Sequence, residues 1–246
     1  MPDTNTVAAL DFGIVRVRPA MQWIRRAPLR FAGIGGLVIA AFAAQTQPEV
    51  ISDIPKHSKE AVAIHTVVAL GILTAPSGRF RPDEPLTRAE FAQAMQRLFA
   101  LKPPAVARNF PDIPSKSPQY TAVEALAPYL GWEILCPGCA LRGDFLPEAP
   151  MSTLEAAVPV LNILLAQNKV VLLKGDQAEA VVKSVPDSAR LRGPLLRSYA
   201  ATAISAGIVS RSAIERGRLT LTRAQAATML DHVQTKCGID KARPRR

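Results

Sequence analysis

The sequence predicts a mainly α-helical fold in which three helix-loop-helix repeats pack as one pseudo-threefold domain. The first observation is a motif that opens a helix and occurs three times, beginning at Leu86, Met151 and Leu221. The second is composition: aromatic residues make up only 5% of the 246 residues, whereas 21 are proline, which suits small helices separated by stiff turns. One helix-loop-helix unit of this size cannot bury its apolar face alone, so three of them are expected to share a core.

Each copy of the motif has the pattern of a helix capping box. A hydroxyl residue is followed three positions later by Glu or Gln, so the hydroxyl accepts a hydrogen bond from the third backbone N–H while the longer side chain reaches back. The predicted boxes are Thr87 with Glu90, Ser152 with Glu155, and Thr222 with Gln225. They mark the expected start of the second helix in each repeat.

Repeat 1 is assigned to residues 50–104. We expect its first helix over about 58–70, where Gly71 ends it. The second helix should run from Thr87 to about 101, because two prolines at 103 and 104 stop it.

Repeat 2 is assigned to residues 108–168. Ser117 and Pro118 form a favourable N-cap and first-turn pair for its first helix, which should end near Leu130. The second helix should begin at Ser152.

Repeat 3 is assigned to residues 185–236, with Gly193 and Pro194 opening its first helix and Thr222 its second. Residues 169–184 are interpreted as a linker. The apolar run 170–173 within it fits either a short strand or an extra helical turn.

Residues 1–44 have the features of a signal peptide or an N-terminal extension. Residues 31–44 form an uncharged apolar run that follows three arginines. A membrane-spanning helix needs roughly 20 apolar residues, whereas the apolar region of a secretory signal has roughly 7–15. Ala41 and Ala43 supply a small-x-small site, so we expect cleavage near Ala43 or Ala44, with an uncleaved anchor as the alternative. Met21 begins a signal of ordinary length and is a candidate for the true start.

Export would place the cysteines in an oxidising compartment. Cys136 and Cys139 flank a Pro-Gly pair, and we expect them to form a local disulfide. A redox-active pair, a metal site and two free thiols remain alternatives. The three histidines show no recognisable ligand spacing, so we expect neither a metal nor a cofactor. Cys237 begins the basic tail, 237–246, where it is either free or paired between chains.

The charge balance fits either an anionic partner or a surplus of charge for solubility combined with a basic tail. The formal net charge is +10, which is typical of proteins that meet nucleic acid, a membrane surface or an acidic polymer. However, five of the last eleven residues are Lys or Arg, so the folded body is only mildly basic. No nucleic-acid-binding motif is present, and we expect no nucleic-acid partner. Membrane contact is expected only through an uncleaved N-terminal segment.

The sequence does not favour an enzyme. It contains no nucleophile–base constellation, paired carboxylates or phosphate-binding loop. The only catalytic hypothesis is a thiol centre at Cys136 and Cys139.

The landmarks of repeat 1 resemble those of an S-layer homology repeat. They are Ile51-Ser-Asp-Ile-Pro, Gly71-Ile72, Phe80-Arg-Pro82 and Leu86-Thr-Arg-Ala-Glu-Phe-Ala, with weaker counterparts in repeats 2 and 3. The resemblance implies a compact pseudo-threefold helical domain with grooves between the repeats. It also implies an exported protein of the periplasm or cell envelope that binds anionic, often pyruvylated, cell-wall polysaccharide or a peptidoglycan-linked polymer.

The resemblance assigns glycan binding to one arginine and one aspartate in each repeat. The matching residues are Arg88 and Arg223, and Asp53, Asp112 and Asp187; Thr153 stands where repeat 2 should have its arginine. A guanidinium at the first residue of a helix suits a carboxylate ligand, because it forms two parallel hydrogen bonds beside free N–H groups. Alternatively, these arginines are solvated or pair with a nearby Asp, and each aspartate caps a turn through its own backbone.

The tryptophan that the family usually carries near the start of the first helix is missing. Repeat 1 has Lys59 there, repeat 2 has Gln119, and Trp132 lies at the end of the helix. The competing hypothesis is therefore a structural or protein-interaction protein that keeps the fold without glycan binding.

Overall fold

The computed structural model describes residues 51–55, 57–135, 143–186, 188–215, 220–236 and 238. The chain divides into two units, 1–45 and 46–246, and every described residue lies in the second. The predicted signal segment, the Cys136–Cys139 pair, Cys237 with most of the basic tail, and Asp187 lie outside the described residues.

The described residues are mainly helical, as the sequence predicts. Nine α-helices occur among them: α1 (Ala61–Ala69), α2 (Arg88–Phe99), α3 (Tyr120–Leu126), α4 (Trp132–Leu135), α5 (Thr153–Ala166), α6 (Gly175–Val182), α7 (Pro194–Ser205), α8 (Arg211–Glu215) and α9 (Arg223–Lys236). Single 3₁₀ turns occupy Pro76–Gly78, Ala127–Tyr129 and Ser188–Arg190. The extended pairing among these residues is limited to three isolated bridges.

Helices α2, α5 and α9 each begin directly after the hydroxyl residue of a motif copy. Thr87 Oγ1 accepts from the N–H of Glu90 at 3.2 Å, and the Glu90 carboxylate accepts from the N–H of Thr87 at 3.2 Å. Ser152 and Glu155 make the same reciprocal pair at 3.3 and 2.7 Å. Thr222 and Gln225 repeat it at 3.3 and 3.1 Å.

Segment 169–184, interpreted from the sequence as a linker, contains helix α6. This helix packs against α7 and buries Ala178 and Val182. Residues 171–174 have neither of the conformations left open for the apolar run, because they carry no regular secondary structure. The Leu173 N–H donates instead to Thr202 Oγ1 on α7 at 3.0 Å, so a side chain replaces the hydrogen bond that a helix or strand would supply.

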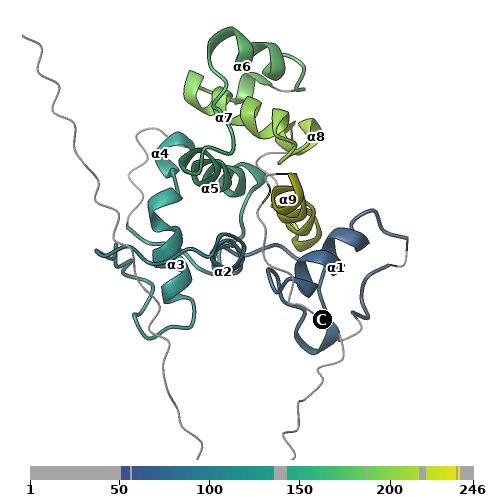
Figure 1. Ribbon diagram of the computed structural model, residues 1–246, viewed down its shortest axis with the longest axis vertical. Coiled ribbons are helices and arrows are strands. Elements are labelled where there is room, and N and C mark those ends of the chain that lie inside the picture. The colour runs from purple at the N-terminus through teal and green to yellow at the C-terminus, as the bar shows by residue number, and fades with distance from the viewer. Residues whose placement is uncertain are drawn as a thin grey trace, which may run out of the picture. The chain divides into compact units, whose positions relative to one another are not determined.

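Helices of different repeats pack against one another in a regular order along the chain (Figure 1). The second helix of repeat 1, α2, packs on α3 of repeat 2; α5 packs on α7 of repeat 3; and α9 packs back on α1 of repeat 1. The last described helix therefore contacts the first.

The three motif copies meet at one junction of backbone hydrogen bonds. The Leu86 N–H donates to the carbonyl of Leu221 at 2.9 Å, the Leu221 N–H to Met151 at 2.7 Å, and the Met151 N–H to Leu86 at 3.0 Å. All three side chains are buried. The three donors and three acceptors form a closed ring, which we call the junction ring, and it places the starts of α2, α5 and α9 together.

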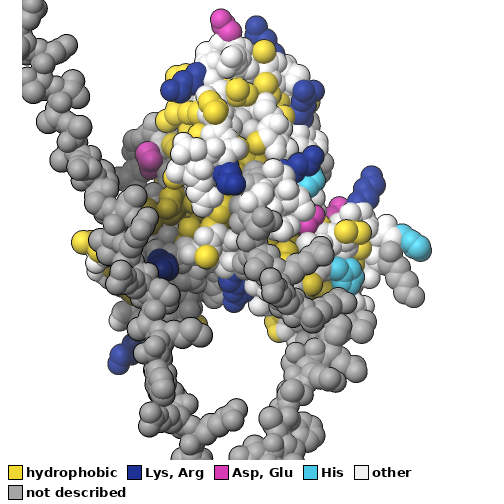
Figure 2. Space-filling model, viewed as in Figure 1, with side chains coloured by type: hydrophobic (Ala, Val, Ile, Leu, Met, Phe, Trp, Pro, Cys, Tyr) yellow, Lys and Arg dark blue, Asp and Glu magenta, His cyan; other side chains and the backbone are white. Residues whose placement is uncertain are grey.

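The surface of the described residues carries its basic groups singly. Figure 2 shows Lys and Arg side chains scattered over the visible face rather than gathered into one patch. Among the described residues, no helix has the length and apolar character needed to cross a membrane.

Candidate functional site

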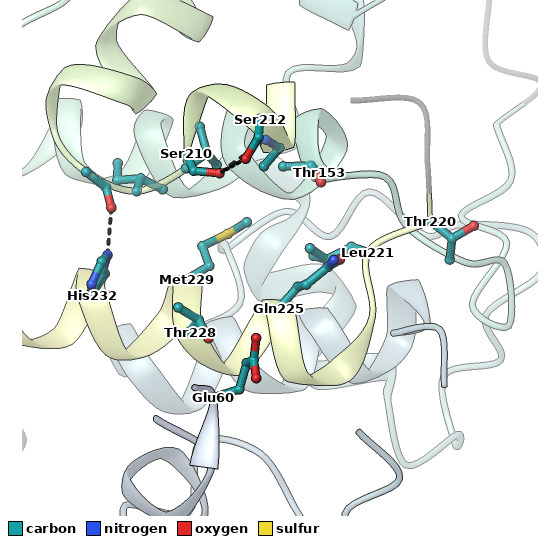
Figure 3. A pocket seen from close by; sticks show the side chains of 14 residues that line it. Glu60, Thr153, Ser210, Ser212, Thr220, Leu221, Gln225, Thr228, Met229 and His232 are labelled. Atoms are coloured by element: carbon teal, nitrogen blue, oxygen red, sulfur yellow. Dashed lines mark hydrogen bonds between the residues drawn. The ribbon is translucent and has the colours of Figure 1, made fainter. Parts of the chain in front are cut away.

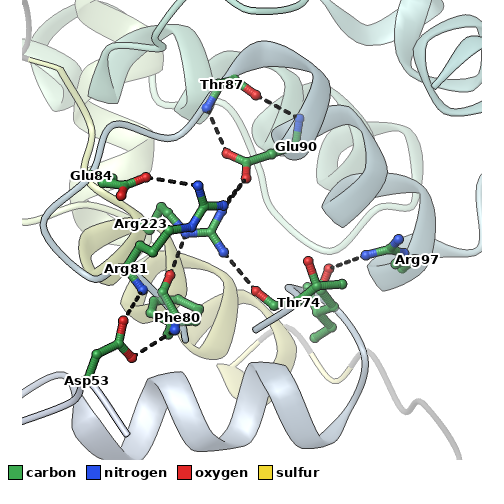
Figure 4. A network of polar contacts seen from close by, with 10 residues as sticks. Asp53, Thr74, Phe80, Arg81, Glu84, Thr87, Glu90, Arg97 and Arg223 are labelled. Carbon is green, nitrogen blue, oxygen red and sulfur yellow. Dashed lines mark hydrogen bonds and ion pairs between the residues drawn. The ribbon is translucent and has the colours of Figure 1, made fainter. Parts of the chain in front are cut away.

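Arg223, one of the two predicted glycan-binding arginines, lies in the interior at the contact between repeats 3 and 1 (Figure 4). Arg223 as a whole is 1% exposed to solvent. Its Nε donates to the Phe80 carbonyl at 2.7 Å, its Nη2 to the Thr74 carbonyl at 2.8 Å, and its Nη1 pairs with the Glu90 carboxylate. Burial lowers the pKa of the guanidinium and the charge of Glu90 opposes this effect. Arg223 therefore joins two repeats through contacts that occupy each nitrogen of its guanidinium.

Arg88 makes the equivalent contact between repeats 1 and 2. Its Nη2 donates to Glu155 at 2.9 Å and its Nη1 to the Phe145 carbonyl at 3.1 Å, and its side chain is 14% exposed. The guanidinium lies 5.6 Å from the ring centre of Trp132. In both interfaces the box arginine of one repeat thus pairs with the box glutamate of the next.

The third interface lacks both charged partners. Thr153 occupies the arginine position of repeat 2, and Gln225 occupies the glutamate position of repeat 3. Instead of an ion pair, this interface holds a cavity of about 450 Å³ that both residues line. We call it the Thr153–Gln225 cavity.

The Thr153–Gln225 cavity combines a polar rim with an apolar floor (Figure 3). Helix α9 contributes Gln225, Met229 and His232, and Ser210 and Ser212 lie across the opening. The Nδ1 atom of His232 lies 2.8 Å from the carbonyl of Gly207, and the two serine hydroxyls are 3.1 Å apart. None of the described residues that line it is Lys or Arg, and Glu60 supplies its one carboxylate.

Asp53 and Asp112, the two predicted aspartates that the structure describes, hold loops rather than lining the Thr153–Gln225 cavity. Asp53 accepts from the N–H groups of Phe80 and Arg81 at 2.8 and 2.7 Å. Asp112 accepts from Phe145 and Leu146 at 2.8 and 2.6 Å. Arg81 and Leu146 both have positive φ, at 59° and 56°. Each carboxylate therefore secures a backbone conformation that L-residues rarely adopt.

The backbone contacts also shift the acidity of Asp53. Burial acts to raise its pKa, but the hydrogen bonds from Phe80 and Arg81 outweigh that effect, and the pKa lies below its ordinary value. A lowered folded-state pKa contributes stability that is present above the unfolded pKa, near 4, and is lost as the pH falls through the folded value.

We therefore expect Asp53→Asn to be destabilising at neutral pH, by about 1–2 kcal/mol, because one backbone N–H loses its acceptor. The deficit should shrink as the pH falls from about 4 to 2, since the wild-type carboxylate is then protonated. Urea unfolding at pH 7, 5, 4 and 3 measures this, with Asp83→Asn at an exposed acid as the control. A deficit that stays constant across this range would contradict the role of the charge.

Repeat 2 contains two groups that sequence reasoning missed. Phe110, Trp132 and Phe145 form an aromatic cluster with ring centres 5.3–6.2 Å apart. The fully buried carboxylate of Glu124 accepts from the N–H groups of Arg108 and Asn109 at 2.6 and 2.9 Å. These contacts fix the entry loop of repeat 2, and the exposed Arg108 guanidinium lies 5.0 Å from the ring centre of Phe110.

Among the residues that the structure describes, no group of three or more His, Cys, Asp or Glu side chains is placed to hold a metal ion.

The sequence left open that Arg88 and Arg223 pair with a nearby Asp, but it did not identify the glutamates of the neighbouring capping boxes as their partners. One feature of the sequence could have indicated this pairing. The arginine position of repeat 2 and the glutamate position of repeat 3 are both uncharged, as Thr153 and Gln225, although the capping pattern is retained.

Comparison with known families agrees with the geometry of repeat 1. Residues 50–92 match the family model for the S-layer homology domain, from the Asp53 segment through the first capping box. No curated protein matches the chain. S-layer homology domains are generally cell-envelope anchoring domains, and their partners are cell-wall secondary polymers. Residues 50–92 of this chain are therefore similar to an S-layer homology domain.

Proposed function

We propose that this protein is a non-catalytic module that attaches to cell-wall polysaccharide or a peptidoglycan-linked polymer through surfaces between three S-layer homology-like repeats. The observation that carries the proposal is the family match over residues 50–92, because envelope attachment is the general property of that domain. Export to the periplasm or cell surface is part of the same proposal.

The pseudo-threefold arrangement belongs to the proposal and has two supports. The junction ring joins the three helix starts cyclically, each donating to one neighbour and accepting from the other. The helix contacts run in the same order, from α2 to α3, from α5 to α7 and from α9 to α1. Three similar units related by a common axis account for both patterns.

Because Arg88 and Arg223 point into the protein, we expect another residue to contact the acidic groups of the polymer. All three guanidinium nitrogens of Arg223 and both Nη atoms of Arg88 are engaged within the protein, so we expect an acidic group of the polymer to use another cation. Arg108 is exposed and lies over the rings of Phe110 and Trp132. A guanidinium beside aromatic rings offers both a fork for a carboxylate and an apolar surface for a sugar ring.

Sedimentation with purified sacculi tests the proposal. The wild-type protein should sediment with sacculi that carry their polymer, and less of it should sediment after chemical removal of pyruvate. Arg108→Ala should weaken binding about tenfold, since a charge-assisted hydrogen bond contributes about 1.5–3 kcal/mol. Arg192→Ala, at another exposed arginine, is the matched control and should bind like wild type.

Wild-type protein that stays in the supernatant at all sacculus concentrations would contradict envelope-polymer binding. That result would favour the second candidate, a structural or protein-interaction protein of the envelope. The observation behind this alternative is that both box arginines are used to hold the repeats together.

A further inference from the structure

The first helices of the three repeats, α1, α3 and α7, have matching buried positions. Each has two fully buried apolar residues three positions apart, and these pairs are Ile64 and Val67, Val123 and Leu126, and Ala200 and Ala203. Because 3.6 residues make one helical turn, the two residues between each pair lie on the opposite side of the helix. We call this side the outer face, and it carries His65 and Thr66 in α1, Glu124 and Ala125 in α3, and Ala201 and Thr202 in α7.

In repeats 2 and 3 the outer face is fully buried, and the chain at the entry of the repeat covers it. Glu124, which is 0% exposed, accepts hydrogen bonds from the N–H groups of Arg108 and Asn109 at 2.6 and 2.9 Å. Thr202, which is 2% exposed, accepts from the N–H of Leu173 at 3.0 Å. In both repeats, therefore, a polar side chain of the outer face holds the backbone of the chain that leads into the repeat.

Among the described residues, no segment covers the outer face of α1 in this way. His65 is exposed and Thr66 is half-buried, and Val62, one turn earlier on the same side, is 75% exposed. The hydroxyl of Thr66 donates to the Val62 carbonyl at 2.9 Å, which is the contact that Thr202 makes in α7. Within the described part of the chain no N–H donates to Thr66 in return, so its oxygen can still accept a hydrogen bond.

The chain at the entry of repeat 1 is residues 46–50, which belong to the second of the two units and lie outside the described residues. The expected signal cleavage near Ala43 or Ala44 leaves this segment on the mature chain. It is the part of the chain whose position along the sequence matches the segments that cover α3 and α7.

The charges of this segment complement the outer face of α1. Counted back from the early aspartate of each repeat, Glu49 occupies the position of Arg108, and counted forward, His65 occupies the position of Glu124. The acid thus lies on the helix in repeat 2 and on the entry segment in repeat 1. An imidazole N–H can donate a hydrogen bond to a carboxylate, so the two positions again supply one donor and one acceptor.

We infer that residues 46–50 dock on the outer face of α1 in the same chain, with Glu49 beside His65 and a backbone N–H donating to Thr66. Helix α1 then has the same kind of cover as α3 and α7, and the N-terminal end that signal cleavage leaves is held on the domain. The inference is independent of which polymer the protein binds.

Hydrogen–deuterium exchange of the full chain, followed by mass spectrometry, tests this docking. The backbone N–H groups of Glu49 and Val50 should exchange at least about tenfold more slowly than in a free peptide of the same sequence, because a docked segment exchanges only when it opens. Circular dichroism melting of each variant below establishes that it is folded.

Exchange of the two charges identifies the partner on α1. His65→Glu places a second carboxylate beside Glu49, and Glu49→Lys removes the acceptor, so each should bring the segment close to the exchange rate of the free peptide. The double variant should restore slow exchange, because the charges then attract in the opposite sense. Gln177→Glu, which adds a negative charge at an exposed residue of α6, is the matched control and should leave the exchange unchanged.

Each outcome decides for or against the docking. Slow exchange that is lost in both single variants, restored in the double variant and kept in Gln177→Glu supports it. Wild-type exchange at the rate of the free peptide overturns it, and so does slow exchange that persists in both folded single variants. Slow exchange that appears only at high protein concentration, together with a dimer in size-exclusion chromatography, assigns the segment to a second copy and overturns docking within one chain.

Discussion

Replacing Arg223 by Ala is expected to lower the free energy of unfolding by about 3 kcal/mol or more, which is a large part of the stability of an ordinary domain. The substitution leaves the Phe80 and Thr74 carbonyls without their donor and removes the cation that pairs with Glu90. It also opens a cavity, because the side chain is among the largest that are fully buried. Chemical denaturation followed by circular dichroism measures the loss.

The control for this experiment is Arg192→Ala at an exposed arginine, which should change stability by no more than about 0.5 kcal/mol. Arg88→Ala should fall between the two, because Arg88 is more exposed and makes fewer hydrogen bonds. Equal stability of Arg223→Ala and Arg192→Ala would show that Arg223 does not hold repeats 1 and 3 together.

Gly131→Ala is the second substitution with a large expected effect, a loss of about 3 kcal/mol. Gly131 has φ of +58°, a conformation that costs an L-residue about 1–2 kcal/mol. A Cβ there would also lie 2.7 Å from Asn162 Nδ2 and 2.7 Å from Val158 Cγ1 on α5. The added methyl group must therefore displace the Asn162 and Val158 side chains, at a cost of about 1–3 kcal/mol.

Gly71→Ala is the matched control. Gly71 ends α1 with a similar φ of +65°, but nothing lies within 4 Å of a Cβ placed there. Its substitution should show the backbone cost alone, about 1–2 kcal/mol. If both variants lose the same stability by urea unfolding, then the close approach of α5 to Gly131 does not constrain the packing of repeat 2.

The helices that could be predicted were those with chemical markers in the sequence. A hydroxyl residue followed three positions later by Glu or Gln caps a helix through local hydrogen bonds. Helices α2, α5 and α9 accordingly begin after Thr87, Ser152 and Thr222. Helix α6 had no such marker, since Lys174 precedes it and makes no side-chain cap. Its existence depends on the contact with α7, which is a tertiary effect that periodicity over eight residues does not reveal.

The candidate site was less predictable because partner identity is not local. The sequence placed Arg88 and Arg223 at the first turn of a helix, but it gave no means of knowing that each faces a glutamate 67 or 133 positions away. Asp53 and Asp112 likewise accept from backbone groups 27 to 34 positions distant. The cavity is lined by residues from separate segments of the chain, including Thr153 and Gln225, and such a volume has no sequence motif.

The junction ring has a consequence for how the domain folds. In an open repeat array, stability is a sum over neighbours, and a terminal repeat can be removed while the others persist. Here the third helix start bonds to the first, and Arg223 reaches partners 133 to 149 positions earlier in the chain. No repeat is terminal in space, so we expect the three to unfold in a single cooperative transition, and removal of α9 to expose repeat 1 as well as repeat 3. Folding must also await the synthesis of the last helix, because contacts of such long sequence separation form late.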